Sequence, residues 1–246
     1  MRLVLLLLLL AVSMAQTPEK QYEVIPDVQY CRGGREPLLM DIFIPVSRWQ
    51  TPTPAVLWLH GGGWERGDKN GNSGALMLAD AGFVTASIFY RLSGDSPFPA
   101  DIEDCKCAIR YLRANARRYG IDPNRIGVAG ASAGGHLAEL VATADDKAGL
   151  EGNGGWQSVS SRVQAASAYY GVSDFTVGAN QFQNHTGKVV VKLFRGDEKE
   201  KPELYKQASP TCTFRNKILR YCSYTEIRTT SFRSTNPLKW RRLMNA

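Results

Sequence analysis

Short apolar runs alternate with longer amphipathic stretches through the middle of this chain. Four runs are typical of buried strands: 54–60, 82–90, 125–130 and 163–175. The stretch 101–120 repeats apolar residues at three- and four-residue steps and ends at Gly120, which predicts an amphipathic helix, and 134–145 predicts another. This alternation predicts an α/β class protein with a mainly parallel sheet flanked by helices.

The first fifteen residues carry the pattern of a secretory signal peptide. Arg2 precedes an apolar run over 3–12, and Ser13-Met14-Ala15 supplies small residues for cleavage. The run is shorter than the roughly 20 residues that span a bilayer. We therefore expect 1–15 to be removed, the protein to be secreted or periplasmic, and no membrane association afterwards.

The net charge of +7 comes entirely from the last 36 residues. Residues 211–246 hold eight Lys or Arg and one acid, whereas 1–210 hold 22 basic and 22 acidic residues. Because residues 1–210 carry no net charge, a basic nucleic-acid-binding face has little support, and no nucleic-acid partner is expected.

Five cysteines are an odd number for an exported chain. Cys105 and Cys107 lie two apart in the predicted helix and point to different sides, and Cys31 has no obvious partner in the sequence. No metal-ligand spacing occurs. We expect buried free thiols and no metal site.

The segment Gly130-Ala131-Ser132-Ala133-Gly134 fits the pattern G-x-S-x-G between a predicted strand and a predicted helix. Small neighbours allow a tight turn that exposes the serine, which makes Ser132 the candidate nucleophile. Upstream, His60-Gly61-Gly62-Gly63-Trp64 follows another strand. Backbone N–H groups of Gly62 or Gly63, with that of Ala133, would stabilise the oxyanion of acyl transfer. The alternative is a glycine-rich turn without chemistry.

The segments LHGGGWERGDK, YRLSGDSPFPADIEDCKCAIRYLRANARRYGIDPNRIGVAGASAGGHLA and KPELYKQASP resemble the exported bacterial α/β-hydrolases with a feruloyl- or acetylesterase-like (BD-FAE-like) domain, relatives of the hormone-sensitive-lipase group. The resemblance covers about residues 22–210. It implies an α/β-hydrolase fold that acts on carboxylic esters without a cofactor. It also implies that Trp64 and Tyr90 lie near the acyl site, although large aromatic residues after strands more often belong to the core.

The base and the acid that such a serine needs are not recognisable. In this fold the acid and then the histidine follow the serine in the chain. His60 belongs to the oxyanion loop, His136 is expected to pack or cap, and His185 lacks the surrounding pattern. Asp174 fits a role in a turn or at a helix start better than the role of the catalytic acid. Residues 211–246 contain neither Asp nor His.

Read one nucleotide earlier, the codons for 211–237 permit several choices, which include Y-I-S-K-Q-D-P-P-L-L-L-I-H-G-D-K-D-D-L-V-P-I-N-Q-S. This string resembles an apolar strand followed by an H-G-x-x-D acid turn. The Glu226–Ile227 junction then gives only Asp or Asn. This suggests a hydrolase domain over 16–210 followed by a frameshifted tail, 211–246, so that the C-terminal strands and helix of the fold are missing. A genuine basic tail is the alternative.

Two functional hypotheses follow from the sequence. The first is a serine carboxylesterase that forms an acyl-enzyme on acetyl or feruloyl esters of carbohydrate. The second is a catalytically inactive relative that binds a ligand in the same pocket, or a chain whose open sheet edge favours aggregation. The acyl and alcohol specificity and the oligomeric state do not follow from the sequence.

Overall fold

The computed structural model describes residues 21–34, 36–48, 50–177, 185–213 and 220–224, so the expected signal peptide lies outside the described part. The strands are β1 (Tyr22–Gly33), β2 (Glu36–Pro45), β3 (Thr53–Leu59), β4 (Val84–Ile88), β5 (Ile121–Ala131), β6 (Ala165–Tyr169) and β7 (Arg220–Tyr224). The helices are α1 (Ser73–Asp80), α2 (Ala100–Ala114), α3 (Ala116–Tyr119), α4 (Ala133–Thr143), the 3-10 turn η1 (Asp146–Ala148), α5 (His185–Phe194), α6 (Pro202–Gln207) and α7 (Pro210–Thr213).

These strands form one sheet in the order β1-β2-β4-β3-β5-β6-β7. Strands β4, β3, β5, β6 and β7 are parallel, while β1, β2 and β4 pair antiparallel. The mainly parallel α/β sheet expected from the sequence is therefore confirmed, and each expected strand and helix in the centre of the chain is present.

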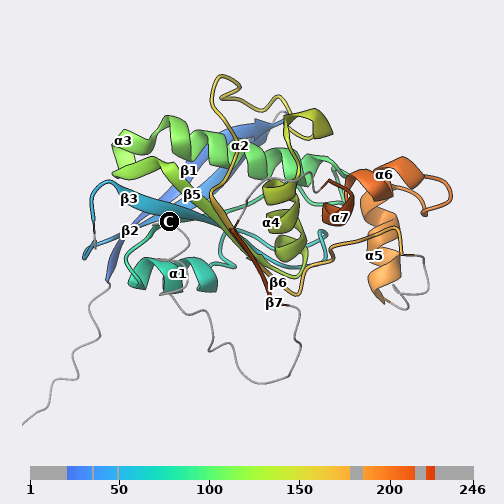
Figure 1. Cartoon of the computed structure of the whole chain (residues 1–246), viewed down its shortest axis with the longest axis horizontal. Coiled ribbons are helices and arrows are strands. Elements are labelled where there is room, and N and C mark those ends of the chain that lie inside the picture. The colour runs from blue at the N-terminus through green and yellow to red at the C-terminus, as the bar shows by residue number, and fades with distance from the viewer. Residues whose placement is uncertain (1–20, 35, 49, 178–184, 214–219, 225–246) are drawn as a thin grey trace, which may run out of the picture.

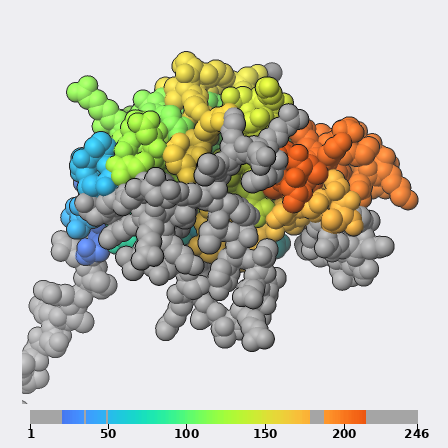
Figure 2. Space-filling view, viewed as in Figure 1, coloured from blue at the N-terminus to red at the C-terminus, as the bar shows by residue number. Residues whose placement is uncertain are grey.

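Helices cover both faces of this sheet (Figure 1). Helices α2, α3 and α4 cover one face over a large apolar core, and α1 covers the other over a smaller core around Trp58 and Phe83. Helices α5, α6 and α7 gather at one end of the molecule (Figures 1 and 2). Within the described residues, every helix is too short or too polar to cross a bilayer.

In the described part of the segment after Pro210, one strand is present. Strand β7 pairs in parallel with β6 at the edge of the sheet, from Ala165 opposite Arg220 to Tyr169 opposite Tyr224. This strand lies in the tail, 211–246, where the sequence predicts that the C-terminal strands of the fold are missing. The segments 214–219 and 225–246 lie outside the described residues.

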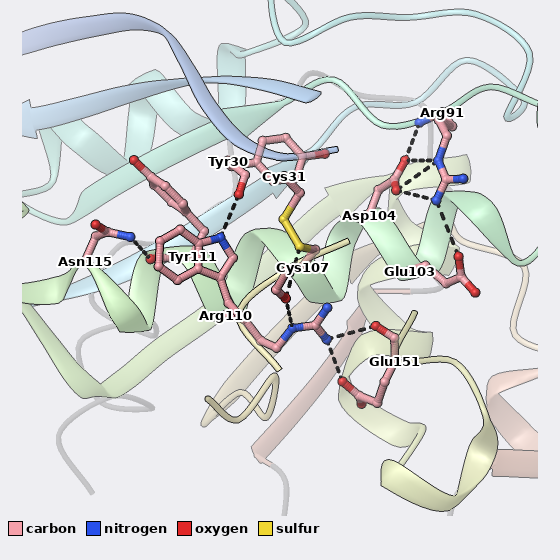
Figure 3. Close-up of a disulfide and its surroundings, with 12 residues drawn as sticks. Tyr30, Cys31, Arg91, Glu103, Asp104, Cys107, Arg110, Tyr111, Asn115 and Glu151 are labelled. Atoms are coloured by element: carbon pink, nitrogen blue, oxygen red, sulfur yellow. Dashed lines mark hydrogen bonds and ion pairs between the residues drawn. A yellow bond between two sulfur atoms is a disulfide. The ribbon is translucent and has the colours of Figure 1, made fainter. Parts of the chain in front are cut away.

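A disulfide joins Cys31 on β1 to Cys107 on α2, with the two Cα atoms 6.4 Å apart (Figure 3). The expectation that these two thiols are free is therefore wrong. The partners lie 76 residues apart and meet because α2 packs across the edge hairpin. Cys105, two residues before Cys107, faces the core as a buried free thiol, as expected for residues two apart on a helix.

Candidate active site

Ser132 occupies a sharp turn between the end of β5 and the start of α4. Its backbone has φ 55° and ψ −119°, a left-handed conformation that costs energy for a residue with a side chain. The turn is fixed on both sides: the Ser132 N–H donates to the Tyr169 carbonyl at 2.9 Å, and the Ser132 carbonyl accepts from the His136 N–H at 3.0 Å. The Ser132 side chain is exposed, so the strain presents its hydroxyl to a ligand.

Glycine is required beside the serine by close backbone packing. A β-carbon at Gly130 would collide with the Gly134 carbonyl group and would lie 2.9 Å from the Leu59 carbonyl oxygen. The first turn of α4 is therefore pressed against the ends of β3 and β5. This explains in physical terms why the glycines flank Ser132.

The second glycine-rich segment, after β3, turns back on itself next to the serine. The Gly62 carbonyl accepts from the N–H groups of Glu65 at 3.3 Å and Arg66 at 3.2 Å. Gly62 has φ 127°, and a β-carbon there would collide with the Arg66 carbonyl oxygen. The Gly62 carbonyl is therefore engaged within the turn.

A cavity of about 340 Å³ connects these two segments. It is lined by Gly62, Gly63, Trp64, Glu65, Arg66, Ser132, Ala133, Tyr170, Val172 and Val189. The structure thus brings together all the residues that the sequence assigned to nucleophile and oxyanion hole, namely Ser132, Gly62, Gly63 and Ala133. They converge because β3 and β5 are adjacent parallel strands whose carboxyl ends share one edge.

Trp64 and Tyr90, the two aromatic residues expected near the acyl site, occupy different positions. Trp64 lines the cavity, but most of its indole is buried against His136 and Phe175. Tyr90 is fully buried and does not line the cavity: its ring stacks on His60 at 4.2 Å between centroids, and its hydroxyl donates to the His60 carbonyl at 2.8 Å. Tyr90 therefore packs against His60 beneath the glycine-rich loop, and its expected place near the acyl site stays a prediction.

His136 is fully buried and joins three parts of the site. Its Nδ1 accepts from the Trp64 indole N–H at 3.1 Å, and its Nε2–H donates to the Ala208 carbonyl at 2.9 Å. Burial, only partly offset by the bond to Ala208, lowers its pKa to about 4. The expectation that His136 packs rather than acts as a base is in accord with this geometry.

Among the described side chains, none is positioned to act as the general base for Ser132. His60 is largely buried, its Nδ1 lies 2.7 Å from the Gly61 carbonyl, and burial lowers its pKa. His185 begins α5, but its side chain lies outside the described part. Asp174 accepts from the Thr176 N–H at 2.7 Å in a local turn, the role expected from the sequence. Among the described residues, no cluster of His, Cys, Asp and Glu fits a metal ion.

Sequence reasoning missed five of the residues that line the cavity: Glu65, Arg66, Tyr170, Val172 and Val189. Tyr170 carries a usable signal, because it directly follows β6 at the edge where the other parallel strands end. Val189 has no such signal in the sequence, since only tertiary packing brings α5 to the cavity.

The sequence matches the BD-FAE family model over residues 40–217. The chain belongs to the BD-FAE family. This match includes both glycine-rich segments, 60–64 and 130–134, and the segment that holds α5 to α7.

Curated relatives of this BD-FAE protein are named as esterases. The chain is 34% identical to "Esterase LipQ" of Mycobacterium tuberculosis over 203 residues, 78% of this chain and 46% of the relative. It is 38% identical to "Probable carboxylic ester hydrolase LipM" of the same organism over 61% of this chain and 35% of the relative. The chain therefore spans less than half the length of these two relatives.

Solved structures with a similar fold include carbohydrate esterases. A "truncated form of carbohydrate esterase from gut microbiota" has a TM-score of 0.74 and 27% identity, over 93% of this chain and 86% of that one. A "bifunctional GH43-CE" protein from Bacteroides eggerthii has a TM-score of 0.71 and 28% identity, over 81% of this chain and 28% of that one. The α/β-hydrolase fold is shared with these proteins.

Proposed function

We propose that this protein is a serine carboxylic-ester hydrolase that acts through an acyl-enzyme. One observation carries the proposal: an exposed serine with φ 55° shares a cavity of about 340 Å³ with Gly62, Gly63 and Ala133. A strained serine between a strand and a helix, facing a glycine-rich loop, is the arrangement that nucleophilic acyl transfer requires.

The reaction follows from the positions of these groups. The Ser132 Oγ attacks the ester carbonyl carbon and loses its proton to a base, and backbone N–H groups of Gly62 or Gly63 and Ala133 stabilise the resulting oxyanion. Collapse breaks the bond to the alcohol, which leaves protonated, and an acyl-serine forms. Water then attacks the acyl-serine, releasing the acid and restoring the Ser132 hydroxyl.

For the base and the acid, we propose that a change of reading frame after about Pro210 separates them from this chain. The structure offers one point of support. The shifted frame places its apolar strand over 220–224, and the sheet has β7 at those positions beside β6. In the shifted frame the acid turn would follow that strand, at the sheet edge that carries Ser132.

For the substrate, we propose acetyl or feruloyl esters of carbohydrate. The names of two similar solved structures include a carbohydrate esterase, which supports this class. Export through the signal peptide would bring the enzyme to such a substrate. The Cys31–Cys107 disulfide supports export, because disulfides persist mainly in oxidising compartments.

A second candidate function is ligand binding without turnover. It is favoured by the positions of His60 and His136, whose side chains are buried and engaged with neighbouring groups. In that case the cavity would hold an ester that Ser132 does not attack.

Two chains tested side by side separate these functions: the chain as it stands and a chain translated in the shifted frame after Pro210. Hydrolysis of 4-nitrophenyl acetate and methyl ferulate is measured for each, with S132A as the matched control. We expect the shifted-frame chain to hydrolyse at least one ester and S132A to lose this activity. Ester binding to the shifted-frame chain without hydrolysis by it would favour the binding function, and sequencing the gene past codon 203 tests the frame directly.

A further inference from the structure

The cavity beside Ser132 contains two oppositely charged residues from one short loop, Glu65 and Arg66. Glu65 is held by Lys192 of α5, with Nζ and Oε2 3.4 Å apart. The exposed Arg66 guanidinium has no carboxylate, carbonyl or hydroxyl partner within the described part of the chain. The described wall of the cavity therefore presents one positive charge that its own residues do not satisfy.

Arg66 is tied to the oxyanion loop by its backbone. Its N–H donates to the Gly62 carbonyl at 3.2 Å, and its Cγ would lie 3.2 Å from a β-carbon built on Gly62. The base of the Arg66 side chain is thus fixed one turn of the loop away from the proposed oxyanion hole. Because a guanidinium has five N–H donors in a planar fork, it binds a carboxylate with two parallel hydrogen bonds.

From this placement we infer that Arg66 selects esters that carry a carboxylate close to the reacting carbonyl, such as O-acetylated uronic acids. The inference deepens the proposed function and rests on it for the identity of the reacting bond. The carboxylate can belong to the alcohol, as in a uronic acid, or to the acyl group. In either case its two oxygens meet the unsatisfied N–H groups of Arg66.

Tyr170 supplies a flat surface on the same cavity. It directly follows β6, has φ 44°, and leaves 47% of its surface exposed. An aromatic face in this position suits the apolar face of a sugar ring. A charged sugar would therefore meet an aromatic surface and a cation within one cavity.

Binding is measured by calorimetry with S132A, which retains the cavity and lacks the nucleophile. The probes are the methyl glycosides of an O-acetylated glucuronate and of the matching O-acetylated glucose. We expect the glucuronate to bind about fivefold more tightly, the effect of one exposed ion pair. The preference should shrink in 0.5 M salt because the partners are exposed. The double variant S132A/R66Q should lose it, whereas S132A/R117Q, which loses an exposed arginine on α3, should keep it.

A hydrolysis arm with the shifted-frame chain tests the acyl side. It compares mono(4-nitrophenyl) adipate with 4-nitrophenyl hexanoate, with and without R66Q. Equal binding of the two glycosides to S132A together with equal kcat/KM for the two acyl esters overturns the inference, as does a carboxylate preference that survives R66Q. Carboxylate-selective binding without hydrolysis leaves the Arg66 site standing and rejects the esterase function. Hydrolysis without a preference for carboxylate esters supports the esterase function and rejects the Arg66 site.

Discussion

Two regions of this molecule are held in place by different kinds of interaction. The nucleophile edge, consisting of Gly62, Gly63, Ser132 and Ala133, depends on backbone geometry, positive φ angles and close carbonyl contacts. The α2 clamp, consisting of Cys31, Lys106, Cys107, Arg110 and Glu151, depends on side chains: one disulfide and the ion pairs of Glu151 with two buried cations. Figure 3 shows the disulfide and the pair of Arg110 with Glu151.

In the clamp, Glu151 lies 2.6 Å from the Lys106 Nζ and 2.8 Å from the Arg110 Nη1. Both cations are almost completely buried, so Glu151 is needed to satisfy them. We therefore expect the stability of the fold and the reactivity of Ser132 to depend on different residues. Variants of the clamp should lower stability with little effect on Ser132, and variants of the nucleophile edge should lower reactivity first.

The largest effect is expected from removing the disulfide with C31S/C107S. The bond closes a loop of 76 residues, and in the chain-entropy picture its loss costs about 4 kcal/mol of stability. Chemical denaturation of the oxidised protein and the variant measures this difference. In the shifted-frame chain, the rate at which a fluorophosphonate labels Ser132 at 20 °C should be the same with and without the disulfide, and a large drop in this rate would break the proposed separation.

The next effect is expected at the opposite region, from Gly62→Ala. The new methyl group collides with the Arg66 carbonyl oxygen, so the loop must shift and an oxyanion N–H moves away. Loss of one such donor typically lowers the rate by about 10²–10³. Ester hydrolysis by the shifted-frame chain measures this loss. Gly94→Ala is the matched control, because a β-carbon there meets no atom within 4 Å.

His136→Asn sharpens the comparison, because this residue links the nucleophile helix to Trp64 and Ala208. Folding lowers the His136 pKa from 6.5 to about 4, so the unfolded chain binds more protons between these values. Stability from this residue is therefore complete above pH 6.5 and is lost as pH falls toward 4, by about 3 kcal/mol. H136N should lack this part of the pH dependence in denaturation curves at pH 7 and pH 4. Parallel curves for the two proteins would contradict the burial of a neutral imidazole.

The smallest effect is expected from Glu151→Gln in the clamp. It leaves Lys106 and Arg110 without their anionic partner and should cost about 2 kcal/mol at pH 7, as for a hydrogen bond to a charged group. The cost stays below that of breaking a fully buried pair because the Glu151 side chain is 31% exposed. Hydrogen bonds and ion pairs from Lys106, Ser161 and Arg110 outweigh burial and lower the Glu151 pKa below 4.5. The wild-type advantage is therefore present above pH 4.5 and is lost as pH falls through the lower folded value. Thermal unfolding at pH 7 and pH 3 should show the two proteins converging.

The central strands and helices could be predicted from the sequence because their apolar patterns are local and strong. The turn at Ser132 and the glycine-rich loop beside it could be predicted for a related reason: a tight turn between a strand and a helix restricts the residues at fixed spacings. The disulfide, the position of Tyr90 beneath His60 and the position of Val189 at the cavity could not be predicted in this way. Each depends on segments that are distant in sequence and meet only in the folded chain.

The sequence by itself therefore determined the α/β class, the sharp turn at Ser132 and the glycine-rich loop at 61–63, since backbone sterics act between near neighbours. Only the tertiary structure decided that Cys31 meets Cys107, that Tyr90 lies under the loop and outside the cavity, and that Arg66 lines the cavity beside Ser132. The physical reason is that contacts between distant segments depend on strand order and helix packing. A local pattern of residues predicts each element and does not predict how the elements are arranged.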